Sequence, residues 1–198
     1  MRDFAQDIKA LTLNTATLGH NLDGHGAGWG VERGTQGVRE SLKIVTERLQ
    51  QALVVAADRG VKLALEPLNP VYAGNRSCLT TLRDALDICD ALGSDNLGVA
   101  VDVYPMVGHR SFAAVAAGGG GRILGYHLCD WLADTSDVLL DRGMMGDGVA
   151  DLRAIRANVE AAGYRGACEV EVVSAENWWK RPPDEVLDVM ALRFRAVC

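Results

Sequence analysis

Hydrophobic positions follow two alternating spacings along the chain from residue 37 onward. Short and nearly continuous apolar runs, VKLALE at 61–66 and LGVAVDV at 97–103, are typical of parallel strands that are buried on both faces. RILGYHL at 122–128 and ACEVEVV at 167–173 continue this series of predicted strands. Between the strands, apolar residues recur every three or four positions, which predicts helices.

The predicted helices cover residues 37–59, 79–92, 151–162 and 184–197. The first has the clearest apolar face, formed by Val38, Leu42, Val45, Leu49, Leu53 and Ala56. A glycine directly follows each of the first three helices, as is common just past a helix end. SFAAVAA at 111–117 predicts a further short helix, and GGGG at 118–121 predicts a turn or a flexible break.

Strands that alternate with helices of this length form βαβ units around a parallel sheet. The sequence therefore predicts an α/β fold of the (β/α) TIM-barrel type. A closed barrel needs eight strands and typically about 250 residues. The chain has 198 residues, and its pattern accounts for four to five βα units, so we expect a partial barrel.

The first 36 residues differ from the rest, and we interpret residues 1–36 as an atypical N-terminal segment and 37–198 as the barrel part. LTLNTATL at 11–18 is a candidate remnant strand. HNLDGHGAGWGVERGTQG at 20–37 is glycine-rich and has no hydrophobic period. A loop over the active site, a poorly ordered segment and an altered gene start are three alternatives for this segment.

Composition and charge narrow the class of protein. Hydrophobic residues make up 48% of the chain and charged residues 23%, as in ordinary globular proteins. The net charge of −6 argues against general affinity for nucleic acid, which needs a basic surface. No apolar run approaches the roughly 20 residues that span a bilayer, and MRDFAQDIKAL lacks the pattern of a signal peptide. We therefore expect a cytoplasmic protein without a nucleic-acid or membrane partner. The five scattered cysteines predict no disulfide framework.

Four residues with metal-binding side chains stand at the ends of the predicted strands: Glu66, Asp102, His127 and Glu171. The carboxyl ends of the strands form the face of a (β/α) barrel that carries the active site. Each residue alone has a plain structural explanation, such as a solvated strand end. Asp102 is harder to explain, because an aspartate in an apolar run is costly unless it is paired or binds a metal. The recurrence in consecutive units predicts a shared site for a divalent cation.

Six motifs follow one another along the chain: EPLNP, VDVYP, YHLCDW, DRGMMGDG, AAGYRGACEVEVVS and NWWKRPPDEVL. In this order and spacing they resemble the sugar phosphate isomerase/epimerase family, which has a xylose isomerase-like TIM barrel. The resemblance runs from about residue 37 to the end, and it implies the C-terminal part of a barrel that lacks its N-terminal strands. It also implies that Glu66, Asp102, His127 and Glu171 each bind one divalent metal ion, commonly manganese, magnesium or cobalt.

The resemblance further implies a reaction and a role for three side chains. Glu66 and Glu171 would move a proton at the carbon next to a carbonyl, and Arg142 in DRGMMGDG would contact substrate oxygens. A surface-loop role for Arg142 remains the plain alternative. A divalent cation stabilises the enediolate that proton abstraction creates, and carboxylates can remove and return the proton. The chain departs from many relatives at Pro105, where they carry a substrate-contacting histidine.

We therefore expect a metal-dependent isomerase or epimerase of a sugar, sugar phosphate or keto-polyol. A metal-dependent dehydratase of an inosose-type substrate and a truncated, inactive family member are the alternatives. An endonuclease is disfavoured by the net charge of −6. A partial barrel exposes strand edges and apolar surface, so we expect a homo-oligomer. The alternatives are that the chain binds a different protein chain, or that it is unstable and inactive.

Overall fold

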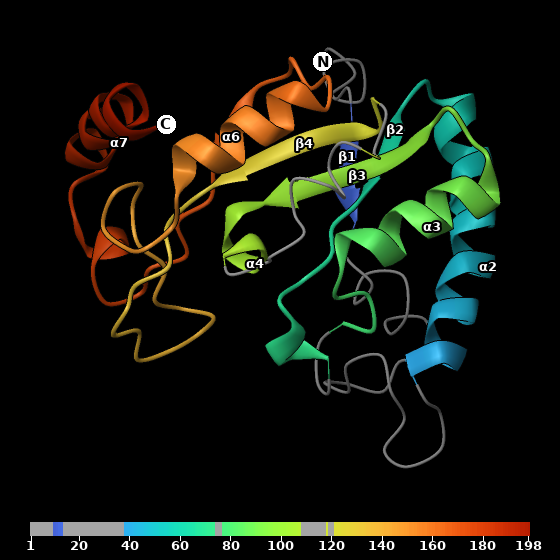
Figure 1. Cartoon of the computed structure of the whole chain (residues 1–198), viewed down its shortest axis with the longest axis horizontal. Helices are drawn as coiled ribbons and strands as arrows, with labels where there is room; N and C mark the ends of the chain where they lie inside the picture. Colours follow the sequence, from blue (N-terminus) through green and yellow to red (C-terminus); the bar gives the residue numbers. More distant parts are fainter. Residues whose placement is uncertain (1–9, 14–37, 74–76, 108–117, 119–120) are drawn as a thin grey trace. The chain divides into compact units, whose positions relative to one another are not determined.

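The computed structural model describes residues 10–13, 38–73, 77–107, 118 and 121–198 (Figure 1). These residues divide into two compact units, Met1–Val101 with Gly121–Gly125, and Asp102–Gly120 with Tyr126–Cys198. The expectations for the glycine-rich segment at 20–37 and for SFAAVAA lie outside the described residues. The division of the chain at residue 36 therefore stays a prediction.

The first unit contains the strands β1 (Ala10–Leu13), β2 (Lys62–Leu65) and most of β3 (Leu97–Asp102). β1 pairs with β2 and β2 pairs with β3, both in parallel, with Leu13 opposite Leu65 and Leu65 opposite Val99. β3 is followed in the sheet by β4 (Ile123–Leu128), whose first half belongs to this unit. The residues of β3 are all buried, as the nearly continuous apolar run predicts.

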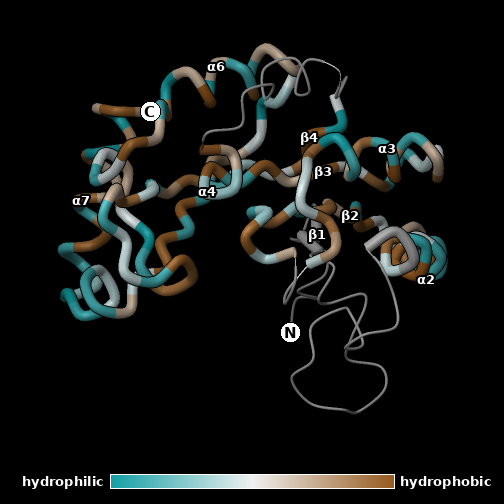
Figure 2. Tube along the Cα trace, turned by 60° about the horizontal axis from the view of Figure 1, so that its bottom comes forward, coloured by the Kyte–Doolittle hydropathy of each residue, from teal (hydrophilic) through white to brown (hydrophobic). Residues whose placement is uncertain are grey.

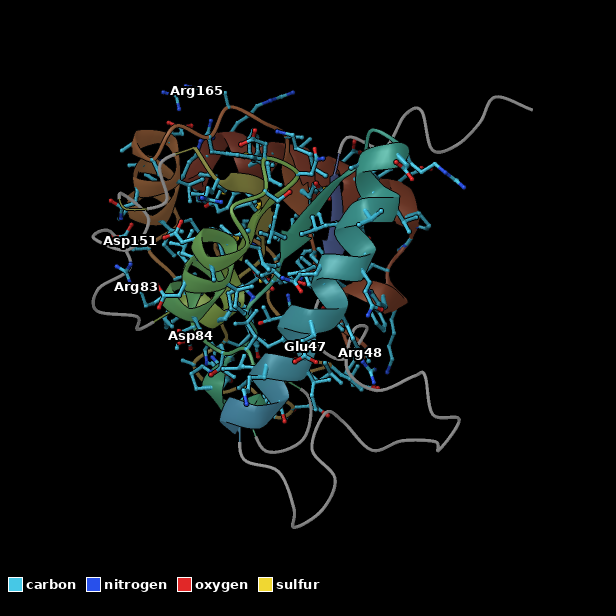
Figure 3. All side chains as sticks on the ribbon, turned by 90° about the vertical axis from the view of Figure 1, so that its right-hand side faces the viewer. Glu47, Arg48, Arg83, Asp84, Asp151 and Arg165 are labelled. Atoms are coloured by element: carbon cyan, nitrogen blue, oxygen red, sulfur yellow. The ribbon has the colours of Figure 1, made fainter. Side chains whose placement is uncertain are left out.

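Two helices connect these strands, α2 (Val38–Asp58) and α3 (Leu82–Leu92), and they lie next to each other in Figures 1 and 2. The apolar face of α2 is buried at Val45, Leu49, Leu53 and Ala56. Charged side chains such as those of Glu47 on α2 and Arg83 on α3 are exposed (Figure 3). Both helices therefore cover the sheet with one face, as their periodicity predicts.

The start of α3 differs from the sequence-based expectation of residue 79. Thr81 has an extended backbone, and its side-chain oxygen accepts a hydrogen bond from the backbone N–H of Asp84 at 3.1 Å. This N-cap satisfies one of the amides that have no partner inside the helix, so the helix begins after Thr81. Leu79 instead uses its carbonyl oxygen to accept a hydrogen bond from Leu68 N–H.

The second unit contains the second half of β4 and β5 (Cys168–Val170), which pair in parallel with His127 opposite Glu169. Its helices are α4 (Val103–Met106), α6 (Leu152–Ala161) and α7 (Pro183–Val197), with short 3₁₀ turns at Pro70–Tyr72 in the first unit and Trp178–Lys180 in the second. Two expectations were partly wrong here. The helix α4 was missed, and β5 is shorter than the predicted strand at 167–173.

Hydrogen bonds explain both differences. The Asp102 side chain accepts a hydrogen bond from Tyr104 N–H at 2.9 Å, so a helical turn begins where the apolar run suggested more strand. After Glu171, the chain leaves β4, and the carbonyl oxygen of Val173 accepts a hydrogen bond from Arg142 N–H at 2.8 Å. The end of the predicted strand thus pairs with the long connection that follows β4.

The strand order β1-β2-β3-β4-β5 equals the order along the chain, with a helix after most strands. This is the topology of consecutive βα units in a (β/α) barrel. Five strands among the described residues make the barrel partial, as predicted. Among the described helices, none combines the length and the apolar character that crossing a bilayer requires.

Candidate functional site

Glu66 stands directly after β2 in the first unit and precedes Pro67, where the chain leaves the sheet. It is 9% exposed, which is low for a glutamate. Its position at the carboxyl end of a parallel strand is the one that the sequence predicted.

Asp102 closes β3 and is 2% exposed. One carboxylate oxygen, Oδ1, accepts the hydrogen bond from Tyr104 N–H that begins α4. The other, Oδ2, accepts a hydrogen bond from Arg142 Nη1 at 2.9 Å, and the two groups form an ion pair. The buried aspartate is thus compensated by a cation and a backbone amide, which is what burial of a charge requires.

Arg142 lies in the long connection after β4 and is 8% exposed. Its Nη1 also donates to Glu171 Oε2 at 3.2 Å, and its guanidinium lies 4.5 Å from the centre of the Tyr104 ring. Its Nε is buried and has no hydrogen-bond partner among the described residues. Burial disfavours the charged form, but Asp102 and Glu171 outweigh this effect and raise the pKa of Arg142 above its ordinary value. Arg142 is therefore a permanent buried cation between two carboxylates.

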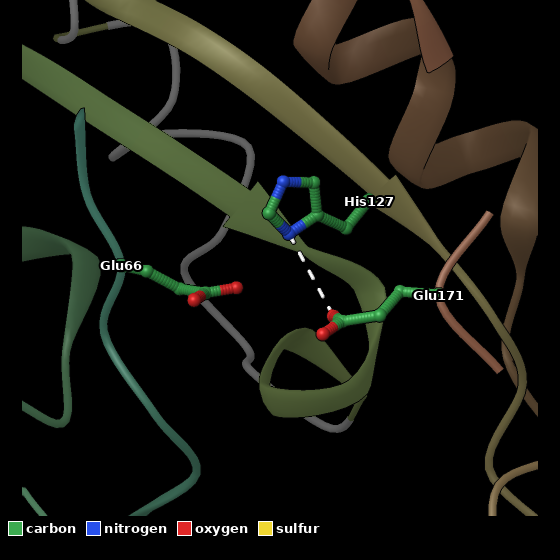
Figure 4. Close-up of side chains that lie close together, drawn as sticks. All are labelled: Glu66, His127 and Glu171. Carbon is green, nitrogen blue, oxygen red and sulfur yellow. Dashed lines mark ion pairs between the residues drawn. The ribbon is translucent and has the colours of Figure 1, made fainter. Parts of the chain in front are cut away.

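His127 and Glu171 form the other end of this group. His127 is buried on β4, and its Nδ1 lies 3.8 Å from Glu171 Oε2, an ion pair when the imidazole is protonated (Figure 4). The Glu171 side chain is 47% exposed, so it is the member of the group that solvent reaches most easily. Its backbone is held by a hydrogen bond from Glu171 N–H to the Leu128 carbonyl at 2.9 Å.

Cys129, one of the five scattered cysteines, is a further neighbour of this group. Its Sγ lies 3.7 Å from Asp102 Oδ1, to which it donates, and 3.8 Å from Arg142 Nη1. Burial and the Asp102 charge raise the pKa of the Cys129 thiol well above its ordinary value, so the thiol stays protonated. In the sequence, the only indication that Cys129 lies beside the site is its position two residues after His127.

The second unit thus brings together four of the predicted site residues, Asp102, His127, Arg142 and Glu171, in one row of close polar contacts. Glu66, which Figure 4 draws with His127 and Glu171, belongs to the first unit. An imidazole and several carboxylates are ligands that manganese, cobalt and zinc accept.

Comparisons with known proteins give the family. A family described as xylose isomerase-like TIM barrel matches residues 2–192. The inosose isomerase of Bacillus velezensis is 28% identical over 156 residues, which cover 75% of this chain and 52% of that protein. The inosose isomerase of Halalkalibacterium halodurans is 26% identical over 171 residues, which cover 79% and 56%. The chain therefore spans about half the length of these curated relatives.

Solved structures share the fold. The protein SMc04130 from Sinorhizobium meliloti 1021 superposes with a TM-score of 0.82 at 46% identity, over 87% of this chain and 63% of that one. The IolI protein with a bound zinc atom superposes with a TM-score of 0.72 at 23% identity, over 84% and 59%. Since the family match extends over almost the whole sequence, the chain belongs to the family of xylose isomerase-like TIM barrels.

Proposed function

We propose that the chain is the metal-binding part of a divalent-metal-dependent isomerase or epimerase. Its substrate is a small sugar, sugar phosphate or keto-polyol, and the reaction moves a proton at the carbon next to a carbonyl. The observation that carries the proposal is the row of close contacts from His127 through Glu171 and Arg142 to Asp102, at the carboxyl ends of β3, β4 and β5. Family relatives named inosose isomerase support a keto-polyol within this class.

The proposed metal ligands are Glu66, Asp102, His127 and Glu171. Glu66, His127 and Glu171 each offer one ligand atom, a carboxylate oxygen or an imidazole nitrogen. Asp102 Oδ2 already accepts a hydrogen bond from Arg142. To bind the metal ion, Asp102 would have to share this oxygen between Arg142 and the ion or give up its bond to Arg142. Three carboxylates and one histidine suit manganese, magnesium or cobalt. The bound zinc of the IolI protein supports a divalent-cation site in the family.

Glu66 and Glu171 are the proposed proton-transfer groups. A divalent cation would stabilise the negative charge that develops on the substrate oxygens during proton abstraction. Glu171 is half exposed and lies close to Arg142 and His127, which supports an accessible carboxylate with a fixed orientation. Arg142 supplies a fixed positive charge, held by Asp102 and Glu171, that can attract substrate oxygens beside the exposed Glu171 carboxylate.

The test has two steps. Isothermal calorimetry with Mn²⁺ on the purified chain should show one binding site, and Glu171→Gln should weaken it. Proton exchange next to the carbonyl is then followed by NMR in D₂O on a panel of ketoses and inososes. Exchange with formation of an isomer or epimer supports the proposal, whereas loss of water supports the dehydratase. Absence of Mn²⁺ binding together with non-cooperative melting would support the inactive family member.

We further propose a homo-oligomer in the cytoplasm. The helix α7 has no buried residue, and Leu187 and Leu192 on it are 58% and 66% exposed, which supports burial against another copy. The five cysteines are free, which supports a reducing compartment. Sedimentation velocity tests the assembly: a single monomeric species across the concentration range would contradict it.

A further inference from the structure

The connection after β4 carries another buried carboxylate, Asp130, which has none of the roles above. Asp130 is 1% exposed. Its Oδ1 accepts hydrogen bonds from the backbone N–H groups of Trp131 and Ala150, each at 2.9 Å, and its Oδ2 accepts one from Gly146 N–H at 2.9 Å. Three backbone donors compensate the cost of burying this side chain.

The backbone of Asp130 is tied to the same loop. Asp130 N–H donates to the Gly143 carbonyl at 2.8 Å, and Gly143 N–H donates back to the Asp130 carbonyl at 3.0 Å, as in an antiparallel bridge. Asp130 therefore contacts the loop at its beginning, middle and end, at Gly143, Gly146 and Ala150. The loop is folded around a single residue.

Two glycines allow this close approach. A Cβ on Gly148 would lie 2.0 Å from the Trp131 carbonyl oxygen and 2.7 Å from Asp130 Oδ1. A Cβ on Gly143 would lie 3.3 Å from the Asp130 Cβ and still closer, 2.9 Å, to a side-chain carbon of Leu132. The backbone can come this close to Asp130 only where the side chain is a hydrogen atom.

Arg142 directly precedes Gly143, whose backbone is hydrogen-bonded to both the N–H and the carbonyl oxygen of Asp130. On its other side, Arg142 N–H donates to the Val173 carbonyl at 2.8 Å. The Arg142 backbone is therefore fixed between Asp130 and the segment after β5, while its side chain reaches Asp102 and Glu171. A shift of Gly143 would move the guanidinium out of its place between the two carboxylates.

We propose that Asp130 is a positioning residue that holds the loop 143–150 and, through Gly143, keeps Arg142 between Asp102 and Glu171. Among the described residues, the hydrogen bonds of Asp130 go to Trp131, Gly143, Gly146 and Ala150 and to none of the proposed metal ligands, so Asp130 acts through Arg142. Its effect on turnover rests on the proposed function, whereas its effect on Arg142 can be measured without turnover.

The variant Asp130→Asn tests this role, because asparagine keeps the shape but places an NH₂ group where a carboxylate oxygen accepted. At least one backbone N–H then faces another donor, and the loop must shift. We expect kcat/KM to fall roughly 100-fold, as a small misplacement near a site can cause. In an Arg142→Ala background the same substitution should cause no further loss, since both changes remove the same interaction.

Arginine Nε–H signals in ¹⁵N NMR spectra provide the readout that is independent of turnover. The Arg142 signal, assigned by its absence in Arg142→Lys, should be shielded from solvent exchange in the wild type because Nε is buried. It should exchange faster in Asp130→Asn. The matched control is Asp137→Asn in the same connection, where an exposed carboxylate accepts from Leu139 and Leu140 N–H. It should leave both the signal and kcat/KM unchanged.

Several outcomes decide the question. If Asp130→Asn only lowers the melting temperature and leaves the Arg142 signal and kcat/KM unchanged, Asp130 merely stabilises the fold and the proposal is wrong. If Asp130→Asn does not fold, Gly146→Ala replaces it, because its N–H bonds Oδ2 and its φ of +88° disfavours alanine. An unchanged Arg142 signal in that folded variant overturns the proposal as well. If the Arg142 signal changes in Asp130→Asn but the wild-type chain turns over no substrate, the role of Asp130 is supported and the proposed function is wrong.

Discussion

The ion pair between Arg142 and Asp102 gives the most direct prediction. Arg142→Met removes the guanidinium and leaves Asp102, which is 2% exposed, without its buried cation. Breaking a buried ion pair from one side typically costs about 3–5 kcal/mol of stability. Tyr104 N–H still bonds the remaining carboxylate, so we expect the lower end of this range, about 3 kcal/mol. The Glu171 contact adds little, because that side chain is 47% exposed and exposed pairs contribute at most about 1 kcal/mol.

Urea denaturation followed by tryptophan fluorescence measures this loss, since Trp131 stacks on Tyr104 with ring centres 4.3 Å apart. The companion variant Asp102→Asn removes the charge that Arg142 compensates. If the ion pair is the cause, Arg142→Met should cost about 2 kcal/mol less in the Asp102→Asn background. A loss under about 1 kcal/mol for Arg142→Met, or equal losses in both backgrounds, would refute the reasoning.

The other predictions concern the metal, the sheet and the pH dependence. Glu171→Gln should weaken Mn²⁺ binding in calorimetry and abolish turnover, while Glu169→Gln, an exposed neighbour on β5, should change neither. Gly98→Ala should lower the unfolding free energy by about 3 kcal/mol, because its Cβ would lie 2.2 Å from the carbonyl oxygen of Arg122, directly before β4. Gly93→Ala, with open space but a φ of +59°, should cost only about 1 kcal/mol in the same urea titration. Burial raises the pKa of the Cys89 thiol from 9.0 to about 11, so the contribution of this thiol to stability should be lost as the pH rises from about 9 to 11, because the unfolded thiol ionises first. The fall should be smaller in Cys89→Ala, and equal slopes for both proteins would contradict it.

The buried arginine has a consequence for metal binding. Arg142 already compensates Asp102 and Glu171, so a cation at these carboxylates competes with a guanidinium that cannot lose its proton. Asp102 is therefore either a ligand that shares its charge with Arg142 or a residue that mainly holds Arg142 in place. Mn²⁺ titration of Asp102→Asn distinguishes the two roles, since only the first predicts weaker binding.

The sequence by itself determined the repeating units of the fold. Apolar runs and helical periodicity predicted β2, β3 and β4 and the helix α2 almost to the residue, because burial of apolar side chains dominates the choice between strand and helix. The same apolar runs predicted that four residues stand at strand ends: Glu66, Asp102, His127 and Glu171. The boundaries that were predicted wrongly, at α4 and at the end of β5, depend on two hydrogen bonds: Tyr104 N–H donates to the Asp102 carboxylate, and Arg142 N–H donates to the Val173 carbonyl.

Only the tertiary structure decided what the polar residues do to one another. No spacing in the sequence shows that Arg142 lies between Asp102 and Glu171, 40 and 29 positions away, or that Cys129 donates to Asp102. No sequence pattern shows that the Asp130 carboxylate accepts hydrogen bonds from three backbone amides. The physical reason is that hydrophobic periodicity is a property of neighbouring residues, whereas compensation of a buried charge depends on groups that folding brings together from distant parts of the chain.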